Sequence, residues 1–355
     1  MQNLHIETCP IFFKDKAYLE LNELIKIEDY SSIFILTDTN TQEHCSRILL
    51  QQIKTVKPIE VFEIEAGEKY KHLETCVSLW ETLSEMGADR HSLLINLGGG
   101  VVTDLGGFVA SCFRRGIDFI HVPTSLLGMV DASIGGKNGI DLGALKNQIG
   151  IIRNPKMILV DSNYLPTLPA NELRSGLAEM IKHGLIYDQG YWTKFLHLDK
   201  LTLSDLDALI YESIQIKISV VEQDPTENGI RKILNFGHTL GHAIESYSLT
   251  HHQKHLLHGE AIAIGMLMEA YLSYKLTGLT ETELLEIKQV IQKYYPTPSF
   301  SVDERKKIID LMKFDKKNKG SQINFVLLKK IGECAIDQQV ENELIHEAFD
   351  YASKA

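Results

Sequence analysis

Short apolar runs alternate with helical patterns through the first half of this chain, and this alternation restricts the possible folds more than any other feature. Five runs rich in Ile, Val, Leu and Phe cover residues 32–38, 61–65, 92–97, 118–122 and 156–161. Helical patterns such as 41–56 and 72–86 lie between them. Because parallel strands are joined through helices, we predict an α/β fold with a mostly parallel sheet covered by helices.

The second half of the chain has a different pattern. From about Ala170 onward, apolar residues recur mainly with the 3.6-residue period of a helix. The predicted helices cover residues 172–186, 204–222, 232–248, 260–276 and 281–294, and one strand pair is predicted near 321–328 and 334–336. Pro166 and Pro169 interrupt the pattern between the halves. We therefore predict an α/β domain over residues 1–165 and a mainly α-helical domain over 166–355.

The composition excludes some classes of partner. The 355 residues carry a formal net charge of −11, which argues against a broad surface for nucleic acid or anionic membranes. The sequence has neither a secretory pattern at its start nor an apolar stretch of about 18 residues. The five cysteines are scattered and never in C-x-x-C spacing, which is typical of reduced thiols. We expect a soluble cytoplasmic protein with no nucleic-acid and no membrane partner.

A strand, a glycine turn and a helix start follow one another over residues 94–107. The triple glycine 98–100 would let the backbone approach a phosphate, whose charge a helix N-terminus favours. The G-x-G-x-x-G spacing is not met, and the turn follows the third predicted strand, so we predict a variant dinucleotide fold. Tight packing without a ligand is the alternative.

Polar side chains also follow two other predicted strands. Asp38 and Asn40 close the run at 32–38, and Glu68 and Lys71 follow the run at 61–65. Ligands gather at the carboxyl ends of strands in such sheets, so these residues are candidates for binding a nucleotide. A plain turn is the alternative for each.

Residues 123–139 combine hydroxyl groups, paired glycines and a lysine, with Lys146 and Asn147 further on. Paired glycines before Lys137 suit a loop whose backbone and ammonium group both face an anion. A solvated loop is the alternative, but the neighbouring Leu126, Val130 and Ile134 favour burial.

The histidines are concentrated in one segment, with six of the fourteen between His238 and His258. His238 and His242 are four residues apart and therefore share one helix face, but Thr239 stands where an H-E-x-x-H motif has its glutamate. Either both imidazoles bind a metal, or one binds it and the other moves protons. His258 opens the next predicted helix, and Glu179 can supply a carboxylate. Two imidazoles and one carboxylate are the usual set for catalytic zinc, and cobalt or manganese would also fit.

Other histidines nearby have simpler interpretations. His251, His252 and His255 lie in a polar stretch and are expected to be solvated, and His183 is a weaker ligand candidate. Cations occur close to the metal candidates in the sequence, at Lys182, Lys217, Arg231, Lys232 and Lys316. A metal with several cations indicates a small anionic substrate carrying carboxylate or phosphate groups.

Five segments together resemble the 3-dehydroquinate synthases of the sugar phosphate cyclase family. They are GGGVVTDLGGF at 98–108, MVDASIGGK at 129–137, AEMIK at 178–182, LNFGHTLGHAIE at 234–245 and HGE at 258–260. The resemblance runs from Asp38 to Gly320. It implies an N-terminal NAD-binding α/β domain and a helical metal-binding domain, with Zn²⁺ or Co²⁺ as the metal.

The resemblance also implies residue roles. Glu179, His238 and His258 would be the metal ligands, with His242 as a polar partner of the substrate. The other positions matching the family's catalytic and substrate-binding residues are Arg115 (toward the phosphate), Asp131, Lys137, Asn147, Lys182, Lys217, Glu227, Arg231, Asn235 and Lys316. The positions matching its NAD-binding residues are Asp38, Asn40, Glu68, Lys71, Gly99, Gly100, Asp104, Thr124, Ser125, Lys137, Lys146, Tyr164 and Thr167.

The implied activity is that of a carbon–oxygen lyase of the shikimate pathway. Its sugar-phosphate substrate, 3-deoxy-D-arabino-heptulosonate 7-phosphate, becomes 3-dehydroquinate and phosphate through transient NAD-dependent oxidation, phosphate elimination, reduction and aldol cyclisation. A homodimer is implied as well. The alternatives are another sugar phosphate cyclase, a metal-dependent polyol dehydrogenase of the same fold, or a non-catalytic regulator.

Two departures from the family pattern stand out. Thr103 replaces a usual glycine beside the phosphate turn, which must accommodate its side chain or shift. The span from His238 to His258 is longer than usual, and a bulging loop carrying His251 and His252 is expected there.

Overall fold

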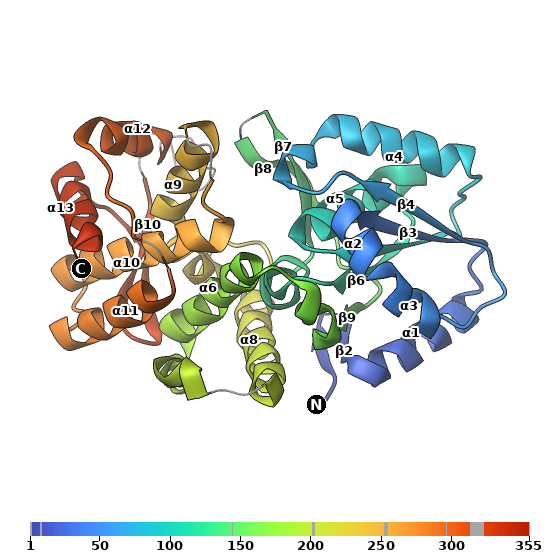
Figure 1. Cartoon of the computed structure of the whole chain (residues 1–355), viewed down its shortest axis with the longest axis horizontal. Helices are drawn as coiled ribbons and strands as arrows, with labels where there is room; N and C mark the ends of the chain where they lie inside the picture. Colours follow the sequence, from blue (N-terminus) through green and yellow to red (C-terminus); the bar gives the residue numbers. More distant parts are fainter. Residues whose placement is uncertain are drawn as a thin grey trace. The chain divides into compact units, whose positions relative to one another are not determined.

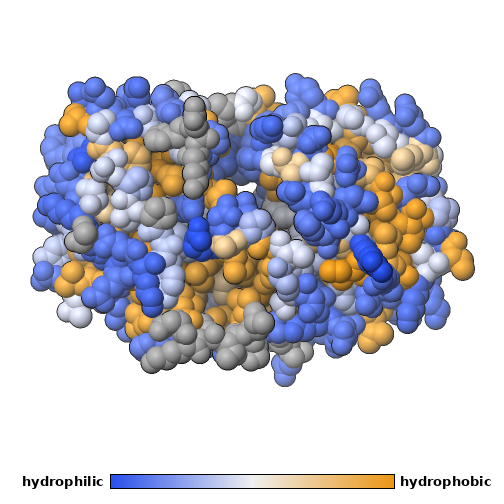
Figure 2. Space-filling model, viewed as in Figure 1, coloured by the Kyte–Doolittle hydropathy of each residue, from blue (hydrophilic) through white to orange (hydrophobic). Residues whose placement is uncertain are grey.

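The computed structural model describes residues 2–7, 9–143, 145–200, 203–251, 255–295, 297–312 and 323–354. The chain forms two compact units, Met1–Pro169 and Ala170–Ala355, which are labelled by element in Figure 1. Figure 2 shows hydrophilic residues over much of the face in view. Among the described residues, no helix is both long and apolar enough to cross a membrane.

The first unit is built on a seven-stranded sheet in the order β1-β2-β9-β6-β5-β3-β4. Its strands are β1 (Leu4–Ile6), β2 (Cys9–Phe13), β3 (Ile33–Asp38), β4 (Ile59–Ile64), β5 (Leu93–Gly98), β6 (Asp118–Pro123) and β9 (Ile158–Val160). Only β1 pairs antiparallel, so the predicted mostly parallel sheet is confirmed. All five predicted strands are present. The short β1 and β2 were not predicted, so the glycine turn follows the fifth strand and not the third.

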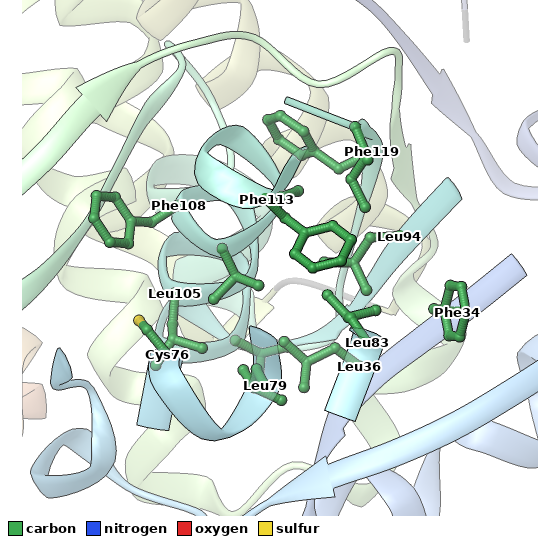
Figure 3. Packing of buried hydrophobic residues seen from close by; sticks show 14 of the residues in the cluster. Phe34, Leu36, Cys76, Leu79, Leu83, Leu94, Leu105, Phe108, Phe113 and Phe119 are labelled. Atoms are coloured by element: carbon green, nitrogen blue, oxygen red, sulfur yellow. The ribbon is translucent and has the colours of Figure 1, made fainter. Parts of the chain in front are cut away.

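Helices cover this sheet, and a buried apolar cluster fills the space beneath two of them. The helices are α1 (Lys14–Glu28), α2 (Thr39–His44), α3 (Ser46–Gln52), α4 (Leu73–Glu85) and α5 (Gly100–Cys112). Figure 3 shows Leu79 and Leu83 of α4 and Leu105 of α5 in this cluster, together with Leu36 of β3. The predicted helix at 41–56 is wrong as one element, because it divides at Cys45. It begins early, since Asp38 caps α2 by accepting a hydrogen bond from Thr41.

The segment after β6 was expected to be a loop, and only part of it is one. A short π-helix, η3 (Gly128–Ala132), is followed by β7 (Lys137–Leu142), which pairs antiparallel with β8 (Leu145–Ile152). The hairpin was missed because glycines interrupt its alternating pattern. Ile134 and Ile140 are buried, in agreement with the expectation that this segment is not simply solvated.

The second unit is mainly helical, as predicted. Its longer helices are α6 (Ala170–Tyr187), α8 (Leu203–Gln223), α9 (His238–His251), α10 (His258–Leu276), α11 (Glu281–Tyr294), α12 (Val302–Met312) and α13 (Asn342–Ser353). Short elements are α7 (Gln189–Thr193), the 3₁₀ turns η5 (Lys194–Lys200) and η6 (Ile230–Asn235), and the pair β10 (Phe325–Lys330) and β11 (Glu333–Gln338). The buried helix α10 contacts α6, α9, α11 and α13 and is therefore the centre of the unit.

The predicted helix at 232–248 is wrong as one element. The 3₁₀ turn η6 ends at Asn235, Phe236 is extended, and Gly237 has a φ of +79° before α9 begins at His238. A positive φ is readily adopted by glycine, so Gly237 lets the chain turn sharply at this point. The expected bulge is also partly wrong, because His251 ends α9 and stacks on Tyr247 at 4.3 Å between ring centroids. His252 lies outside the described residues.

The sheet of the first unit contains a buried imidazole, that of His121 on β6. The side chain is only 2% exposed and accepts a hydrogen bond from Asn96 at 3.2 Å. Burial lowers its pKa from 6.5 to about 3, because the charged form loses its hydration. In the unfolded chain the His121 imidazole is therefore protonated below pH 6.5. In the folded protein the same imidazole is protonated only below about pH 3.

We predict that acidification from pH 6.5 toward pH 3 removes stability through His121, at about 1.4 kcal/mol per pH unit. In the variant His121→Gln this part of the pH dependence should disappear, which urea unfolding at pH 7, 6 and 5 would measure. The exposed His91→Gln is the matched control and should keep the wild-type slope. Equal slopes for wild type and His121→Gln would contradict the prediction.

Candidate active site

Three side chains from three helices of the second unit converge on one point. Glu179 lies on α6, His238 is the first residue of α9, and His258 is the first residue of α10. Oε1 of Glu179 lies 3.6 Å from Nε2 of His238 and 3.5 Å from Nε2 of His258. Each residue offers a donor atom within 4.8 Å of the others. Two imidazoles and one carboxylate, with a fourth position left for water or substrate, form the donor set of a catalytic zinc site.

The other nitrogen of each imidazole is held by an acceptor. Nδ1 of His238 lies 3.1 Å from the carbonyl oxygen of Phe236, and Nδ1 of His258 lies 3.2 Å from Oε2 of Glu245. A carbonyl or carboxylate oxygen only accepts, so each Nδ1 donates its hydrogen, and each Nε2 is directed at Oε1 of Glu179. Metal-binding histidines in proteins are oriented in this way. Glu245 was not among the predicted site residues, although it belongs to the segment 234–245.

The electrostatics of this cluster favour a cation. Glu179 is completely buried, and its second oxygen forms an ion pair with the buried Lys182. Burial by itself lowers the pKa of His258, but the carboxylates of Glu245 and Glu179 outweigh this effect and raise it to about 10. The two carboxylates therefore stabilise positive charge at the position where the Nε2 atoms meet.

His242 lies beside this cluster. Its ring centroid is 5.0 Å from that of His238 and 5.8 Å from that of His258. His242, Glu245 and His258 form a second group of closely placed donors. In that group Glu245 already accepts from Nδ1 of His258, whereas in the group with Glu179 the Nε2 atoms of both imidazoles face one carboxylate oxygen. Both groups contain His258, and the group that includes Glu179 contains His238 and not His242.

A close helix contact brings Glu179 and His258 together. Ser175 precedes Glu179 by one turn of α6, and its Oγ accepts a hydrogen bond from the backbone N–H of Gly259 at 2.9 Å. A Cβ atom at Gly259 would lie 2.1 Å from the carbonyl oxygen of Ser175, so a larger residue would force the helices apart. The glycine next to His258 thus sets how near α10 comes to α6.

Buried cations and a tight loop belong to the same unit. Lys182, Lys217 and Arg231 are all less than 10% exposed. Arg231 donates to the carbonyl oxygen of Pro225 at 2.6 Å, and Asn235 donates to Oε1 of Glu227 at 2.8 Å.

The carboxylate of Asp224 organises this loop. It accepts hydrogen bonds from the backbone N–H groups of Asn228, Gly229 and Arg231, at 3.0, 2.7 and 3.1 Å. Elsewhere in the unit, His183 is buried with Nδ1 2.7 Å from Oγ of Ser213. Lys316 lies outside the described residues.

In the first unit, several predicted cofactor residues form one polar network. Nζ of Lys71 donates to Oδ2 of Asp104 and to Oδ1 of Asn147, both at 2.6 Å. Lys146 pairs with Glu68 at 3.3 Å. Burial lowers the pKa of the Lys71 ammonium, but the charges of Asp104 and Glu68 outweigh it and raise the pKa overall. The network joins α5, β8 and the turn after β4.

The glycine turn has the geometry expected of an anion site. β5 ends at Gly98 and α5 begins at Gly100, so the first N–H groups of the helix lie at the carboxyl edge of the sheet. Thr103, which replaces a usual glycine, is buried, and its hydroxyl donates to the carbonyl oxygens of Gly99 and Gly100 at 3.3 and 3.1 Å. The side chain is thus accommodated within the helix, and the turn keeps its place between β5 and α5.

Other predicted NAD residues follow the strands on either side. Thr124 donates its backbone N–H to Gly98 at 3.0 Å, and Oγ of Ser125 accepts from Gly128 at 3.1 Å. Thr167 ends the 3₁₀ turn Ser162–Thr167, and its hydroxyl donates to the carbonyl oxygen of Tyr164 at 3.2 Å. Burial raises the pKa of the Cys45 thiol to about 11, which argues against a catalytic cysteine there.

The remaining predicted residues of this unit are more scattered. Tyr164 is buried and accepts a hydrogen bond from Tyr18 at 3.2 Å, while Asn40 is exposed on α2. Asp131 lies in η3, and Lys137 is exposed at the start of β7. Arg115 follows the far end of α5, beside Arg90 and Asp89, and not with the glycine turn at the start of that helix.

Most of the chain is similar to known proteins. Residues 61–175 match the family model for the 3-dehydroquinate synthase N-terminal region, and residues 176–318 match the model for the C-terminal region. A 3-dehydroquinate synthase of Parabacteroides distasonis is 42% identical over 334 residues, which are 94% of each chain. One of Clostridium beijerinckii is 39% identical over 347 residues, 95% of this chain and 98% of the relative.

Solved structures share the fold at lower identity. A 2-deoxy-scyllo-inosose synthase complexed with carbaglucose-6-phosphate, NAD⁺ and Co²⁺ has a TM-score of 0.84 at 23% identity, covering 98% of both chains. The 2-epi-5-epi-valiolone synthase of Streptomyces hygroscopicus, with NAD⁺ and Zn²⁺ bound, has a TM-score of 0.81 at 24% identity, covering 99% of both. A butanol dehydrogenase of Thermotoga maritima has a TM-score of 0.62 at 16% identity, covering 99% of this chain and 98% of that one.

We predict that Glu245→Gln weakens metal binding by roughly 10- to 100-fold, because an amide does not hold the Nδ1–H of His258 as a carboxylate does. Isothermal titration of the metal-free protein with Zn²⁺ measures this directly. Glu347→Gln is the control, since that carboxylate accepts from the hydroxyl of Tyr271 and neither from an imidazole nor from the backbone next to one. Equal affinities for Glu245→Gln and wild type would refute the assigned orientation.

Proposed function

The chain belongs to the 3-dehydroquinate synthase family, and we propose that it catalyses this family's reaction. The substrate would be 3-deoxy-D-arabino-heptulosonate 7-phosphate, and the products 3-dehydroquinate and phosphate. The observation that carries the proposal is the 42% identity to a 3-dehydroquinate synthase over 94% of both chains.

We propose Glu179, His238 and His258 as the ligands of one divalent ion, Zn²⁺ or Co²⁺. The donor set fits such an ion, and both Nε2 atoms already face Oε1 of Glu179. When bound, the ion supplies Lewis acidity that lowers the pKa of an alcohol oxygen, as it lowers that of water from roughly 15.7 to about 7. Lys182 would stay on the second oxygen of Glu179 and help keep the carboxylate ionised.

We propose NAD as the second cofactor, held by the first unit. The start of α5 after the glycine turn would bind its phosphates, and Asp38 at the end of β3 would accept from a ribose hydroxyl. The network of Lys71, Asp104 and Asn147 would fix the neighbouring hairpin. When bound, NAD⁺ supplies reversible hydride transfer, so that an alcohol is oxidised and later reduced with no net change.

The predicted polar residues would bind and orient the substrate. We propose that Lys182, Lys217 and Arg231 hold its anionic groups, because buried cations act strongly on anions in a water-poor site. His242 and Asn235 would bond the region of the reacting alcohol, with His242 moving a proton at a ring nitrogen. The substrate's own phosphate can accept the proton lost during elimination, so the proposal needs no further protein base.

The remaining predicted residues keep their proposed roles. In the first unit these are Arg115 toward a phosphate, with Asp131, Lys137 and Asn147 toward substrate, and in the second Glu227 and Lys316. The other NAD-binding positions are Asn40, Glu68, Gly99, Gly100, Thr124, Ser125, Lys137, Lys146, Tyr164 and Thr167. We also propose a homodimer in the cytoplasm, which light scattering and fractionation would test.

Another sugar phosphate cyclase activity is the second candidate. The structural similarity to an inosose synthase, with a TM-score of 0.84, favours a cyclase over a dehydrogenase that would oxidise its substrate with net formation of NADH. Products separate the candidates. Incubation with the heptulosonate phosphate, NAD⁺ and Zn²⁺ should release phosphate and dehydroquinate with no net NADH. A polyol dehydrogenase would accumulate NADH, and another cyclase would leave this substrate unchanged.

We predict that His258→Ala loses the metal and with it the turnover, since one of three protein ligands is gone. Metal affinity should fall by more than the roughly 10- to 100-fold typical of an outer partner. Metal content of the purified protein and phosphate release measure the two effects. His251→Ala is the control, because His251 stacks on Tyr247 at the far end of α9. Normal metal content and turnover in His258→Ala would refute the ligand assignment.

A further inference from the structure

The N-terminus of α9 is capped by a side chain from another helix. Glu269 of α10 is completely buried. Its Oε2 accepts a hydrogen bond from the backbone N–H of Gly237 at 2.6 Å, and its Oε1 accepts from that of Leu240 at 3.2 Å. One carboxylate thus satisfies two N–H groups at the turn where α9 begins.

This cap comes from α10 because the chain before α9 cannot provide one. The first N–H groups of a helix lack partners within the helix, and a Ser, Thr, Asp or Asn just before it usually supplies an acceptor. Here that position is Gly237, which has no side chain and whose φ of +79° makes the entry turn. A carboxylate is well suited to the position, since negative charge is favoured at a helix N-terminus.

Close packing brings the carboxylate to its place. Gly265 lies one turn before Glu269 on α10. A Cβ atom there would lie 2.0 Å from the carbonyl oxygen of Gly237 and 2.7 Å from the backbone nitrogen of Gly241. The backbones of the two helices are therefore in contact at this point, and Glu269 reaches the start of α9.

We propose that Glu269 is a positioning residue for the metal site. The N–H groups it binds belong to Gly237, one residue before His238, and to Leu240, two residues after it. Holding both fixes the backbone that carries this imidazole, and so keeps its Nε2 opposite Oε1 of Glu179. The inference rests on the proposed function in one respect, namely that His238 is a metal ligand.

Glutamine cannot replace this carboxylate without loss. The two N–H groups require two acceptor oxygens, whereas an amide offers one oxygen and directs its own N–H groups at the second donor. The negative charge opposite the helix N-terminus is lost as well. Glu269→Gln should therefore loosen the first turn of α9 while nearly conserving side-chain volume.

The test is a titration of the metal-free full-length protein with Co²⁺, followed by its visible absorption spectrum. We expect Glu269→Gln to bind Co²⁺ roughly 10- to 100-fold more weakly than wild type, with altered bands because the ligand geometry changes. The matched control is Glu283→Gln. Glu283 also accepts two backbone hydrogen bonds, from Thr280 at 3.0 Å and from Ile331 at 3.1 Å, at the start of α11. It should lose stability but keep wild-type Co²⁺ affinity and spectrum.

Wild-type affinity and spectrum in Glu269→Gln would overturn the proposal and leave Glu269 as a structural cap only. His238→Ala separates this result from failure of the metal site itself. Weaker Co²⁺ binding in His238→Ala with unchanged binding in Glu269→Gln refutes only the role of Glu269. Unchanged binding in His238→Ala refutes the ligand set and the inference with it. If Glu269→Gln does not fold, Glu269→Asp decides in the same titration, where weaker binding supports the proposal and unchanged binding overturns it.

Discussion

The structure of the second unit depends on one buried carboxylate, that of Glu179. A carboxylate without exposure to solvent is costly unless positive charge surrounds it. Here Lys182 meets one oxygen, and the Nε2 atoms of His238 and His258 meet the other. Each of these partners is in turn fixed by its surroundings, His238 through Phe236 and His258 through Glu245. The contact of α6 with α10 brings His258 to Glu179, and the turn at Gly237 brings His238 to the same carboxylate.

The first unit shows a comparable organisation around Lys71. Its ammonium joins Asp104 of α5 to Asn147 of β8, so the helix after the glycine turn and the hairpin are tied together. The resemblance predicted that Asp104 and Asn147 contact a ligand. Their hydrogen bonds to Lys71 also connect α5 to the hairpin within the protein. A polar network that is satisfied within the protein can present its remaining donors and acceptors in a fixed geometry.

Most of the fold followed from periodicity, and the failures have local causes. The five predicted strands are runs rich in Ile, Val, Leu and Phe, whereas β1 has three residues, β2 contains Pro10 and β7 contains glycine, so their patterns are weak. The predicted helices at 41–56 and 232–248 break at Cys45 and Gly237, where backbone geometry overrides apolar spacing. In the site, the four-residue spacing predicted that His238 and His242 share one helix face. It could not predict which of them faces Glu179, because Glu179 lies on a different helix. Glu245 and Glu269 look like ordinary helix positions in the sequence, and only tertiary contacts reveal what they bind.

The three donors of the candidate metal site lie far apart in the sequence. Glu179 is the first of them along the chain and His258 is the last. An ion bound to all three would act on the unfolded chain as a cross-link, closing a long loop and reducing its conformational entropy. The ion would then stabilise the helical unit in addition to taking part in chemistry. Supply of the metal would in that case govern how much folded enzyme persists, and not only how fast each molecule works.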